Sequence, residues 1–166
     1  CGPDGGDIDG EAEFDYSGWS VLMSSDGTIV AIGAWGNDGN GSNAGHVRLF
    51  KYSEGSWIQL GSDIDSETSG DYSGYSVSLS DDGTILAIGA YNNNGNGNNA
   101  GHVRVYQYAS GTWTQLGSDI DGEAGDDYSG RSVSLSDDGT IVAIGADGNN
   151  GNGNNAGHVR VYQYAS

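Results

Sequence analysis

Cysteine, proline and positive charge are scarce in this chain, and these shortages exclude several classes of protein. Its 166 residues contain one cysteine, Cys1, so no disulfide can form within the chain. Five lysines and arginines stand against 23 aspartates and glutamates, a formal net charge of −18. Such a surface repels phosphate backbones, which argues against nucleic acid as a partner. No apolar run approaches the roughly 20 residues of a membrane-spanning helix, so no membrane span is expected.

Helical patterns are missing too. The chain has 31 glycines, and glycine destabilises helix interiors. Apolar residues do not recur at helical spacing over any useful length, whereas short runs alternate apolar and polar residues, as half-buried strands do. The sequence therefore predicts an all-β fold.

A repeat of 56 residues organises the chain. The segment 25–34 returns as 81–90 and as 137–146, and Gly-His-Val-Arg recurs at the same step, from Gly45 onwards. Self-similarity at a fixed period is typical of repeat architectures. We divide the chain into repeat 1 (1–62, beginning with the tail of a preceding fourth strand), repeat 2 (63–118) and repeat 3 (119–166, lacking its fourth strand).

The sequence of a complete repeat predicts four antiparallel strands. In the second repeat these are 75–80, 84–90, 101–108 and 112–118, with a tight turn at Asp81–Gly83. One small sheet cannot bury both of its faces, so the units must pack on one another. We expect tandem four-stranded blades in a β-propeller-like array.

The order of these segments resembles the FG-GAP repeat. The residues that carry the resemblance are Tyr72–Val77, Ile88–Ala90 and Gly101–Tyr106, and Gly111–Gln115 is similar to the bacterial subfamily. The resemblance implies the propellers of integrin α-subunits and bacterial surface proteins, and an extracellular or cell-surface location. That family's calcium loop lies between strands 1 and 2, where this chain has only Ser-Asp-Gly-Thr or Asp-Asp-Gly-Thr. The calcium site therefore does not carry over to these turns.

Three blades are too few to close a propeller ring, and the last blade should present an open edge. A longer array, a six-bladed ring of two copies, and an end-to-end fibre would each cover that edge. The expected partners are therefore copies of the chain or further repeats of it. The predicted assembly edge includes Tyr162, Tyr164 and Ser166.

An acidic triplet, Asp-Ile-Asp-x-Glu, precedes each blade. In an extended segment alternate carboxylates point the same way, as a hard cation such as calcium requires; the alternative is a solvated connector. The candidate metal ligands are Asp7, Asp9, Glu11, Asp63, Asp65, Glu67, Asp119, Asp121 and Glu123.

Loops rich in asparagine and glycine follow the second strand of each repeat. They form either hydrogen-bonded connectors or a repeated binding surface for a glycan, an ice-like lattice or a partner chain. The candidate ligand-binding residues are Asn37, Asp38, Asn40, Asn93, Asn94, Asn96, Asn149, Asn150 and Asn152.

The three histidines each begin a third strand, where we expect local capping rather than metal binding. The arginine two residues after each histidine is expected to pair with an acidic residue of its own or a neighbouring blade. These arginines are Arg48, Arg104 and Arg160.

No catalytic motif stands out from the repeat, and repeated polar clusters favour multivalent binding over a single active site. The sequence thus predicts a non-enzymatic extracellular adhesion or structural protein, one form of which is a subunit of a head-to-tail fibre. The alternative is a calcium-dependent or glycan-binding propeller lectin on a cell surface. Surface glycans or matrix proteins are further candidate partners, and calcium is the candidate cofactor.

Overall fold

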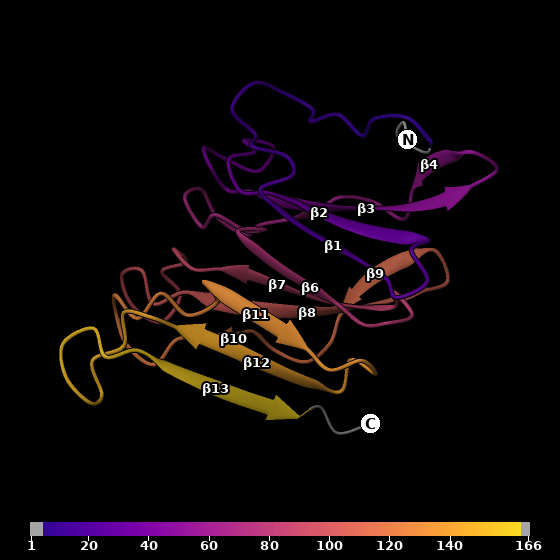
Figure 1. The fold of residues 1–166 in the computed structure, drawn as a ribbon. Helices are drawn as coiled ribbons and strands as arrows, with labels where there is room; N and C mark the ends of the chain where they lie inside the picture. The colour runs from indigo at the N-terminus through magenta and orange to yellow at the C-terminus, as the bar shows by residue number, and fades with distance from the viewer. Residues whose placement is uncertain (1–4, 164–166) are drawn as a thin grey trace.

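The computed structural model describes residues 5–163. Within these residues, thirteen strands form three antiparallel sheets, stacked in chain order (Figure 1). No helix in this range is long and apolar enough to span a bilayer. The strands are β1 (Ser20–Met23), β2 (Ile29–Ala34), β3 (His46–Ser53), β4 (Ser56–Gln59), β5 (Ile64–Asp65), β6 (Ser76–Leu79), β7 (Ile85–Ala90), β8 (His102–Ala109), β9 (Thr112–Gln115), β10 (Ile120–Asp121), β11 (Ser132–Leu135), β12 (Ile141–Ala146) and β13 (His158–Gln163).

Each sheet is one blade with the same strand order. The first blade runs β1-β2-β3-β4, and β5 also pairs with β3 beyond the end of β4. The second blade repeats this with β6 to β10, and the third contains β11, β12 and β13 among the described residues. We call the segments before the blades connectors: residues 5–19, 60–75 and 116–131. The all-β, propeller-like fold predicted from the sequence is confirmed.

The predicted strands of the second repeat match β6, β7, β8 and β9 to within a few residues at their ends. The turn at Asp81–Gly83 is present, with Gly83 at a φ of 72°, a conformation that glycine adopts without strain. The two-residue strands β5 and β10 were not predicted. They pair with the first residues of β3 and β8, so that Ile64 lies opposite Val47 and Ile120 opposite Val103.

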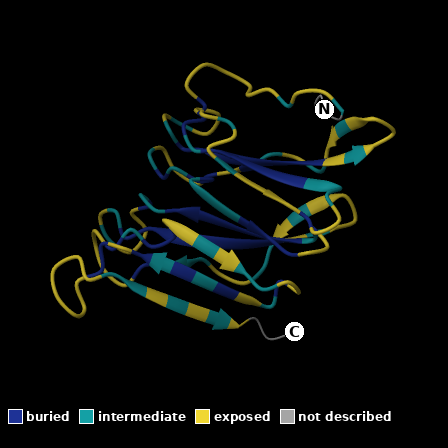
Figure 2. Ribbon diagram, in the orientation of Figure 1, coloured by how far each residue is buried: buried dark blue, intermediate teal, exposed yellow. Residues whose placement is uncertain are grey.

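Two of the three hydrophobic clusters among the described residues lie between blades. One cluster joins Val47 and Leu49 of the first blade to Leu86 and Ile88 of the second. A second cluster joins Val103 of the second blade to Val142 and Ile144 of the third, among others. Every residue of β7 is buried, because this strand has a blade on each side (Figure 2). Removing apolar surface from water, at roughly 25 cal/mol per Å², therefore favours the stack rather than an isolated sheet.

The blades approach so closely that only glycine fits at some positions. A Cβ on Gly33 would overlap the carbonyl oxygen of Gly74, and one on Gly89 would overlap that of Gly130. Ser20 Oγ donates to Gly74 O at 2.7 Å, and Ser76 Oγ donates to Gly130 O at 2.7 Å. Inner strand and connector are thus joined by the same contacts at both junctions.

Aromatic rings near the inner strands also cross from blade to blade. Tyr16 stacks on Trp35 with ring centroids 4.7 Å apart, and Trp35 contacts Tyr72 edge-on at 5.1 Å. The row continues through Tyr91, which contacts Tyr128 at 6.0 Å. Such pairs stabilise by about 0.5–1.5 kcal/mol beyond their buried area, so the row adds to the cohesion of neighbouring blades.

Of the predicted assembly edge, only Tyr162 belongs to the described residues, and Tyr164 and Ser166 lie outside them. Tyr162 is in β13 and its ring packs against the core cluster between the second and third blades. Its buried hydroxyl has no hydrogen-bond partner among the described residues.

Candidate functional site

A buried histidine begins the third strand of the first and second blades. His46 follows Gly45, whose φ of 80° turns the chain from the asparagine–glycine loop into β3. A Cβ on Gly45 would overlap the Ser73 carbonyl of the next connector, so the strand starts against the second blade. The His46 side chain is 2% exposed, and its backbone lies opposite Asp65 in the β3–β5 pairing.

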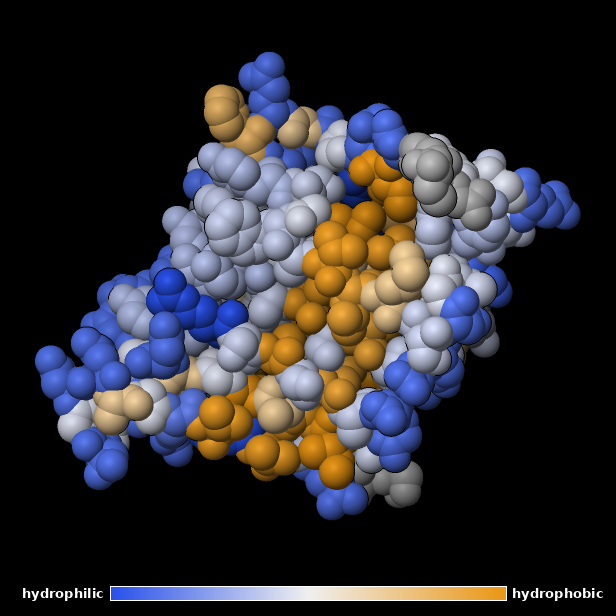
Figure 3. All heavy atoms as spheres, in the orientation of Figure 1, coloured by the Kyte–Doolittle hydropathy of each residue, from blue (hydrophilic) through white to orange (hydrophobic). Residues whose placement is uncertain are grey.

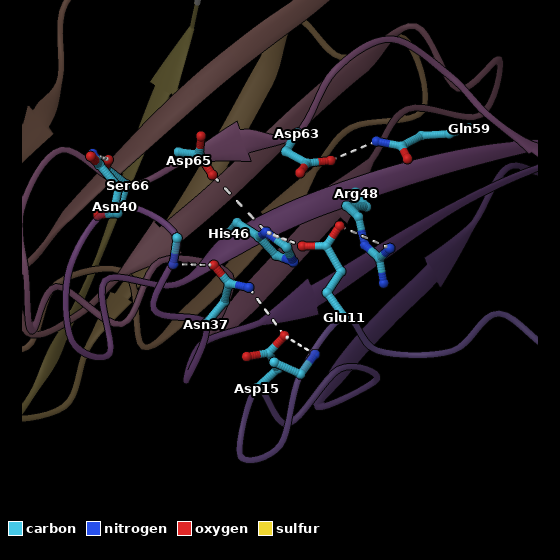
Figure 4. A network of polar contacts seen from close by, with 12 residues as sticks. Glu11, Asp15, Asn37, Asn40, His46, Arg48, Gln59, Asp63, Asp65 and Ser66 are labelled. Carbon is cyan, nitrogen blue, oxygen red and sulfur yellow. Dashed lines mark hydrogen bonds and ion pairs between the residues drawn. The ribbon is translucent and has the colours of Figure 1, made fainter.

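Carboxylates from two successive connectors converge on this imidazole (Figure 4). His46 Nδ1 lies 3.9 Å from Glu11 Oε2, in the first connector, and 4.0 Å from Asp65 Oδ1, in the second. One atom each from Glu11, His46 and Asp63 lie within 4.8 Å of one another. We call these three residues the first cluster.

The second blade repeats the arrangement. Ligand-type atoms of Glu67, His102 and Asp119, the second cluster, also lie within 4.8 Å of one another. His102 Nδ1 is 3.7 Å from Asp119 Oδ2, beyond ordinary hydrogen-bonding distance. His102 Nε2 is buried with no hydrogen-bond partner among the described residues. The same geometry in two blades shows that the repeat builds the cluster.

The aspartate of each cluster is held by a glutamine on the outer strand. Gln59 Nε2 donates to Asp63 Oδ1 at 2.6 Å, and Gln115 Nε2 donates to Asp119 Oδ1 at 2.7 Å. One aspartate oxygen is occupied in this way, and in the second cluster the other oxygen faces the imidazole. A neighbour that orients a carboxylate is typical of metal sites.

The expected pairing of the arginines with acidic residues is present. Arg48 Nη1 lies 3.6 Å from Glu11 Oε1, and Arg48 Nη2 donates to the Asp9 carbonyl at 2.7 Å. Arg104 makes the equivalent contacts with Glu67 and the Asp65 carbonyl. Each arginine fixes the connector that carries the glutamate. Around His46, the three carboxylates of Glu11, Asp63 and Asp65 still exceed this one cation.

Burial lowers the pKa of His102 below its ordinary value of 6.5, because the protonated ring loses hydration, and the charge of Arg104 lowers it further. Asp119, Asp71 and Glu67 oppose the shift without reversing it. The imidazole is therefore neutral at pH 7, which leaves a nitrogen lone pair free to bind a cation.

The third blade contains the same groups in a more open setting. His158 Nδ1 lies 3.7 Å from Glu123 Oε2, and Arg160 Nη1 lies 3.9 Å from Glu123 Oε1. The His158 side chain is 26% exposed, against 2% for His46. Within the described part of the chain, no aspartate stands where Asp63 and Asp119 stand in the first two blades.

The acidic triplets predicted as metal ligands are divided between neighbouring clusters. Asp63 and Asp65 face His46 of the preceding blade, whereas Glu67 of the same triplet faces Arg104 and the second cluster. Asp119 and Glu123 are divided in the same way between the second blade and the third. The backbone carbonyls of Asp9 and Asp121 accept from Arg48 and Arg160, and Asp7 is exposed in the first connector.

The polar groups of the asparagine–glycine loops mostly bind the chain itself. The Asn37 amide donates to Asp15 and accepts from the Gly39 amide, and Asn149 does the same with Asp127 and Gly151. Four other predicted loop residues accept a hydrogen bond from a backbone amide through a side-chain oxygen: Asn93 from Gly95, Asp38 from Asn43, Asn94 from Asn99, and Asn150 from Asn155. The side-chain amides of Asn40 and Asn96 donate to the backbone carbonyls of Ser66 and Gly122. Asn152 is exposed. These loops are thus hydrogen-bonded both within themselves and to the connectors.

The sequence interpretation did not include the histidines among the metal ligands. A signal was available, since histidine and acidic triplet recur with the same period. The period alone did not indicate that the residues of one cluster come from two connectors and a strand, because these segments meet only when the blades pack.

Solved structures with a similar fold come from several bacteria. A proposed 6-phosphogluconolactonase from Bacteroides fragilis matches with a TM-score of 0.59 at 17% identity, over 87% of this chain and 34% of that one. A second proposed 6-phosphogluconolactonase, from Bacteroides uniformis, matches with a TM-score of 0.57 at 16% identity, over 87% of this chain and 35% of that one. The periplasmic gluconolactonase of Pseudomonas aeruginosa matches with a TM-score of 0.54 at 17% identity, over 87% of this chain and 39% of that one. This chain thus spans little more than a third of these proteins, and the likeness concerns the fold.

These matches correct the functional prediction. A non-enzymatic adhesion or structural protein, with a lectin as its alternative, was expected because no catalytic motif stood out. The proteins that share the fold are named as lactonases, so the prediction that this repeat array is not an enzyme is wrong on this comparison.

Family membership follows from the sequence itself. No curated protein matches the chain at a significant level. The family described as FG-GAP repeat matches residues 8–50 and 65–106. Each of these two segments covers most of a connector and the first three strands of the blade that follows it. Together they make up about half of the chain. This chain belongs to the FG-GAP repeat family.

Proposed function

We propose that this chain binds divalent cations at the first and second clusters. One observation carries the proposal: in both blades an atom of a buried imidazole and an oxygen from each of two carboxylates lie within 4.8 Å of one another. Within the clusters, His46 Nδ1 lies 3.9 Å from Glu11 Oε2 and His102 Nδ1 lies 3.7 Å from Asp119 Oδ2. That separation is too long for hydrogen bonds. It is close to the separation of about 3.4 Å expected between ligands that lie about 2.1 Å from a tetrahedral zinc ion.

The donor set supports zinc or manganese more than calcium. Calcium takes six to eight oxygen ligands in proteins, whereas each cluster combines one nitrogen with two carboxylates. Imidazole suits zinc, and carboxylates suit manganese as well. With three protein ligands, a water molecule would complete the coordination shell.

Two electrostatic features favour a cation. His102 is neutral at pH 7, so it does not repel a positive ion. Arg104 is cationic but is directed to the Asp65 carbonyl at 3.0 Å and to one oxygen of Glu67 at 3.6 Å. Glu67 is about half exposed (49%), so an ion can enter from the solvent side of the cluster.

Isothermal titration calorimetry and thermal unfolding with zinc, manganese and calcium test this proposal. We expect zinc to bind at the two complete clusters of each chain and to raise the unfolding temperature. Free zinc at 100 times the Kd would add about 2.7 kcal/mol per site. The double variant His46→Asn/His102→Asn should lose both sites, whereas Asp81→Asn, an exposed turn carboxylate, should keep them. Equal zinc binding by the double variant and the control would refute the proposal.

A second candidate is hydrolysis of a sugar lactone by water bound to such a cation. The observation that favours it is the fold shared with proteins named as gluconolactonases. A cation lowers the pKa of bound water. In the hydrolysis, the oxygen of water would bond to the lactone carbonyl carbon, the ring C–O bond would break, and a proton of that water would pass to the departing ring oxygen to give the hydroxy acid.

A pH-stat assay with gluconolactone tests this candidate. The zinc-loaded chain should hydrolyse the lactone faster than zinc in buffer, and His46→Asn/His102→Asn should return the rate to that background. A rate no higher than that of zinc in buffer would exclude this activity for the chain and leave the cation sites untouched. An extracellular or cell-surface location remains a prediction from the family resemblance.

A further inference from the structure

The third blade exposes apolar residues that the other blades bury. Val159 and Val161 in β13 are 67% and 65% exposed. Their counterparts one repeat earlier, Val103 and Val105, are fully buried against the third blade. In the space-filling view, apolar side chains form a stripe across the blades that continues to the sheet edge where β13 lies (Figure 3). This face has the composition of a blade junction.

A groove of about 560 Å³ lies on the same face. Its lining includes Ser132, Gly145, Gly157, His158 and Val159. In the second blade the positions equivalent to Gly145 and Gly157 are Gly89 and Gly101, and the connector of the third blade fills the space beside them. A Cβ on Gly101 would overlap the Ser129 carbonyl, and one on Gly89 would overlap that of Gly130. The groove therefore lies where a connector packs against the second blade.

The contacts at the inner junctions show what such a connector provides. Ile120 pairs with Val103 across β10 and β8, and the Gly130 carbonyl accepts from Ser76 Oγ. The Asn96 amide donates to the Gly122 carbonyl. On the third blade, Val159 corresponds to Val103, Ser132 to Ser76 and Asn152 to Asn96.

The complementary surface is the connector and inner strand of the first blade. Two repeats before Ile120, Gly122 and Gly130 stand Ile8, Gly10 and Gly18. Ile8 already packs against the core of the first blade, and Arg48 holds the following residue, Asp9, by its carbonyl. Around this segment large apolar side chains are exposed: Phe14 75%, Trp19 53%, Val21 55% and Met23 48%.

We propose that a second copy of this chain docks its first connector on the third blade. Ile8 of one copy lies opposite Val159 of the other as an added strand, and Gly18 covers Gly145. The same contact made twice about a two-fold axis closes two copies into a ring of six blades, within the usual range of four to eight. The contact between a connector and the preceding blade, which already occurs twice inside the chain, occurs here between two chains.

Docking also completes the third cluster, a part of the inference that rests on the proposed cation binding. The aspartate that faces the histidine comes from the next connector: Asp63 for His46 and Asp119 for His102. For His158 and Glu123 the residue at that position is Asp7 of the second copy. The third site would thus be formed at the junction of two copies.

Light scattering over a range of chain concentrations tests the docking. We expect a species with twice the chain mass, favoured by salt because each copy carries a formal charge of −18. Val161→Glu should give the single chain, because it places a charge at the junction where the valine is 65% exposed in one copy. Circular dichroism should show that this variant is folded. A wild-type chain that stays single at all concentrations and salt levels would overturn the docking.

Cysteine pairs test the register in a Cys1→Ser background. Ile8→Cys with Val159→Cys should give covalent two-chain species on oxidation. The matched control, Val103→Cys with Ile120→Cys, has the same pairing within one chain and should cross-link internally. Ile8→Cys with Ser53→Cys, on an exposed strand end, should cross-link no more than background. Equal cross-linking of Ser53 and Val159 pairs would refute the register.

Zinc stoichiometry separates docking from cation binding. In the assembled state we expect three ions per chain, and Asp7→Ala should reduce this to two without changing the mass. Assembly with two ions per wild-type chain would overturn the third site alone, and a single chain with two ions would overturn docking while the proposed function stands. Assembly without zinc binding would reject the cation sites and keep the docking.

Discussion

Arg104 Nη2 donates a 3.0 Å hydrogen bond to the carbonyl oxygen of Asp65, 39 residues earlier in the chain. Asp65 belongs to β5, which pairs with the first blade, whereas Arg104 lies in β8 of the second. Arg48 and Arg160 make the equivalent bonds to the Asp9 and Asp121 carbonyls. The same guanidinium also lies near the cluster glutamate, so one side chain joins two blades and shapes the site.

Replacing this arginine should destabilise the chain. Arg104 is only 7% exposed, and Arg104→Met would leave the Asp65 carbonyl and Glu67 without their cationic partner. We expect a loss of about 2 kcal/mol in the free energy of unfolding. The matched control Lys51→Met changes an exposed residue of β3 and should cost less than about 0.5 kcal/mol. Urea unfolding measures both, and equal losses would show that the interblade bond does not stabilise the fold.

Local sequence patterns were enough to predict the blades. The alternation in β6, the apolar run of β7 and the glycine at the turn each depend on residues close in sequence, as backbone conformation does. The clusters depend instead on the packing of blades. Glu11, His46 and Asp63 belong to three separate segments, and no periodicity within one segment indicates that they meet. The strand β5, which brings Asp65 opposite His46, is two residues long and too short to leave a pattern.

The tight contact between blades makes a sharp prediction for glycine. In Gly89→Ala the new methyl group would overlap the Gly130 backbone carbonyl, and separating the blades should cost about 3 kcal/mol. Gly145→Ala makes the same change in the third blade, where the nearest atom is the Ser132 hydroxyl. That side chain can rotate, so we expect a loss below about 1 kcal/mol in the single chain.

Thermal unfolding at low chain concentration distinguishes the two variants. Gly89→Ala should unfold at a clearly lower temperature than Gly145→Ala. If both variants lose the same stability, the cost arises within the strand and not from the junction between the second and third blades.

Stability should fall as the pH is lowered below about 6.5. The pKa of His102 is lowered by burial and by Arg104, so the unfolded chain takes up a proton at a higher pH than the folded chain does. Above the unfolded value of 6.5 the ring is neutral in both states and its contribution is complete. Between that value and the lower folded pKa, protonation favours the unfolded state.

His102→Gln should therefore flatten the pH dependence of the free energy of unfolding between pH 7.5 and 5.5. Urea unfolding at three pH values within this window gives the slope. The control is Asn94→Ala, an exposed loop residue without a titratable group, which should keep the wild-type slope. An unchanged slope in His102→Gln would mean that another group controls stability in this range.

The glutamine that holds the cluster aspartate should set the affinity for zinc. Gln115 Nε2 donates to Asp119 Oδ1 at 2.7 Å, which leaves Oδ2 facing His102. Gln115→Ala frees the carboxylate to rotate and should weaken zinc binding at the second cluster about tenfold. The first cluster, where Gln59 holds Asp63, should keep its affinity. Calorimetric titration separates the two sites, and Gln107→Ala, on the exposed part of β8, is the control. Unchanged affinity in Gln115→Ala would argue that Asp119 does not need this orientation to bind the ion.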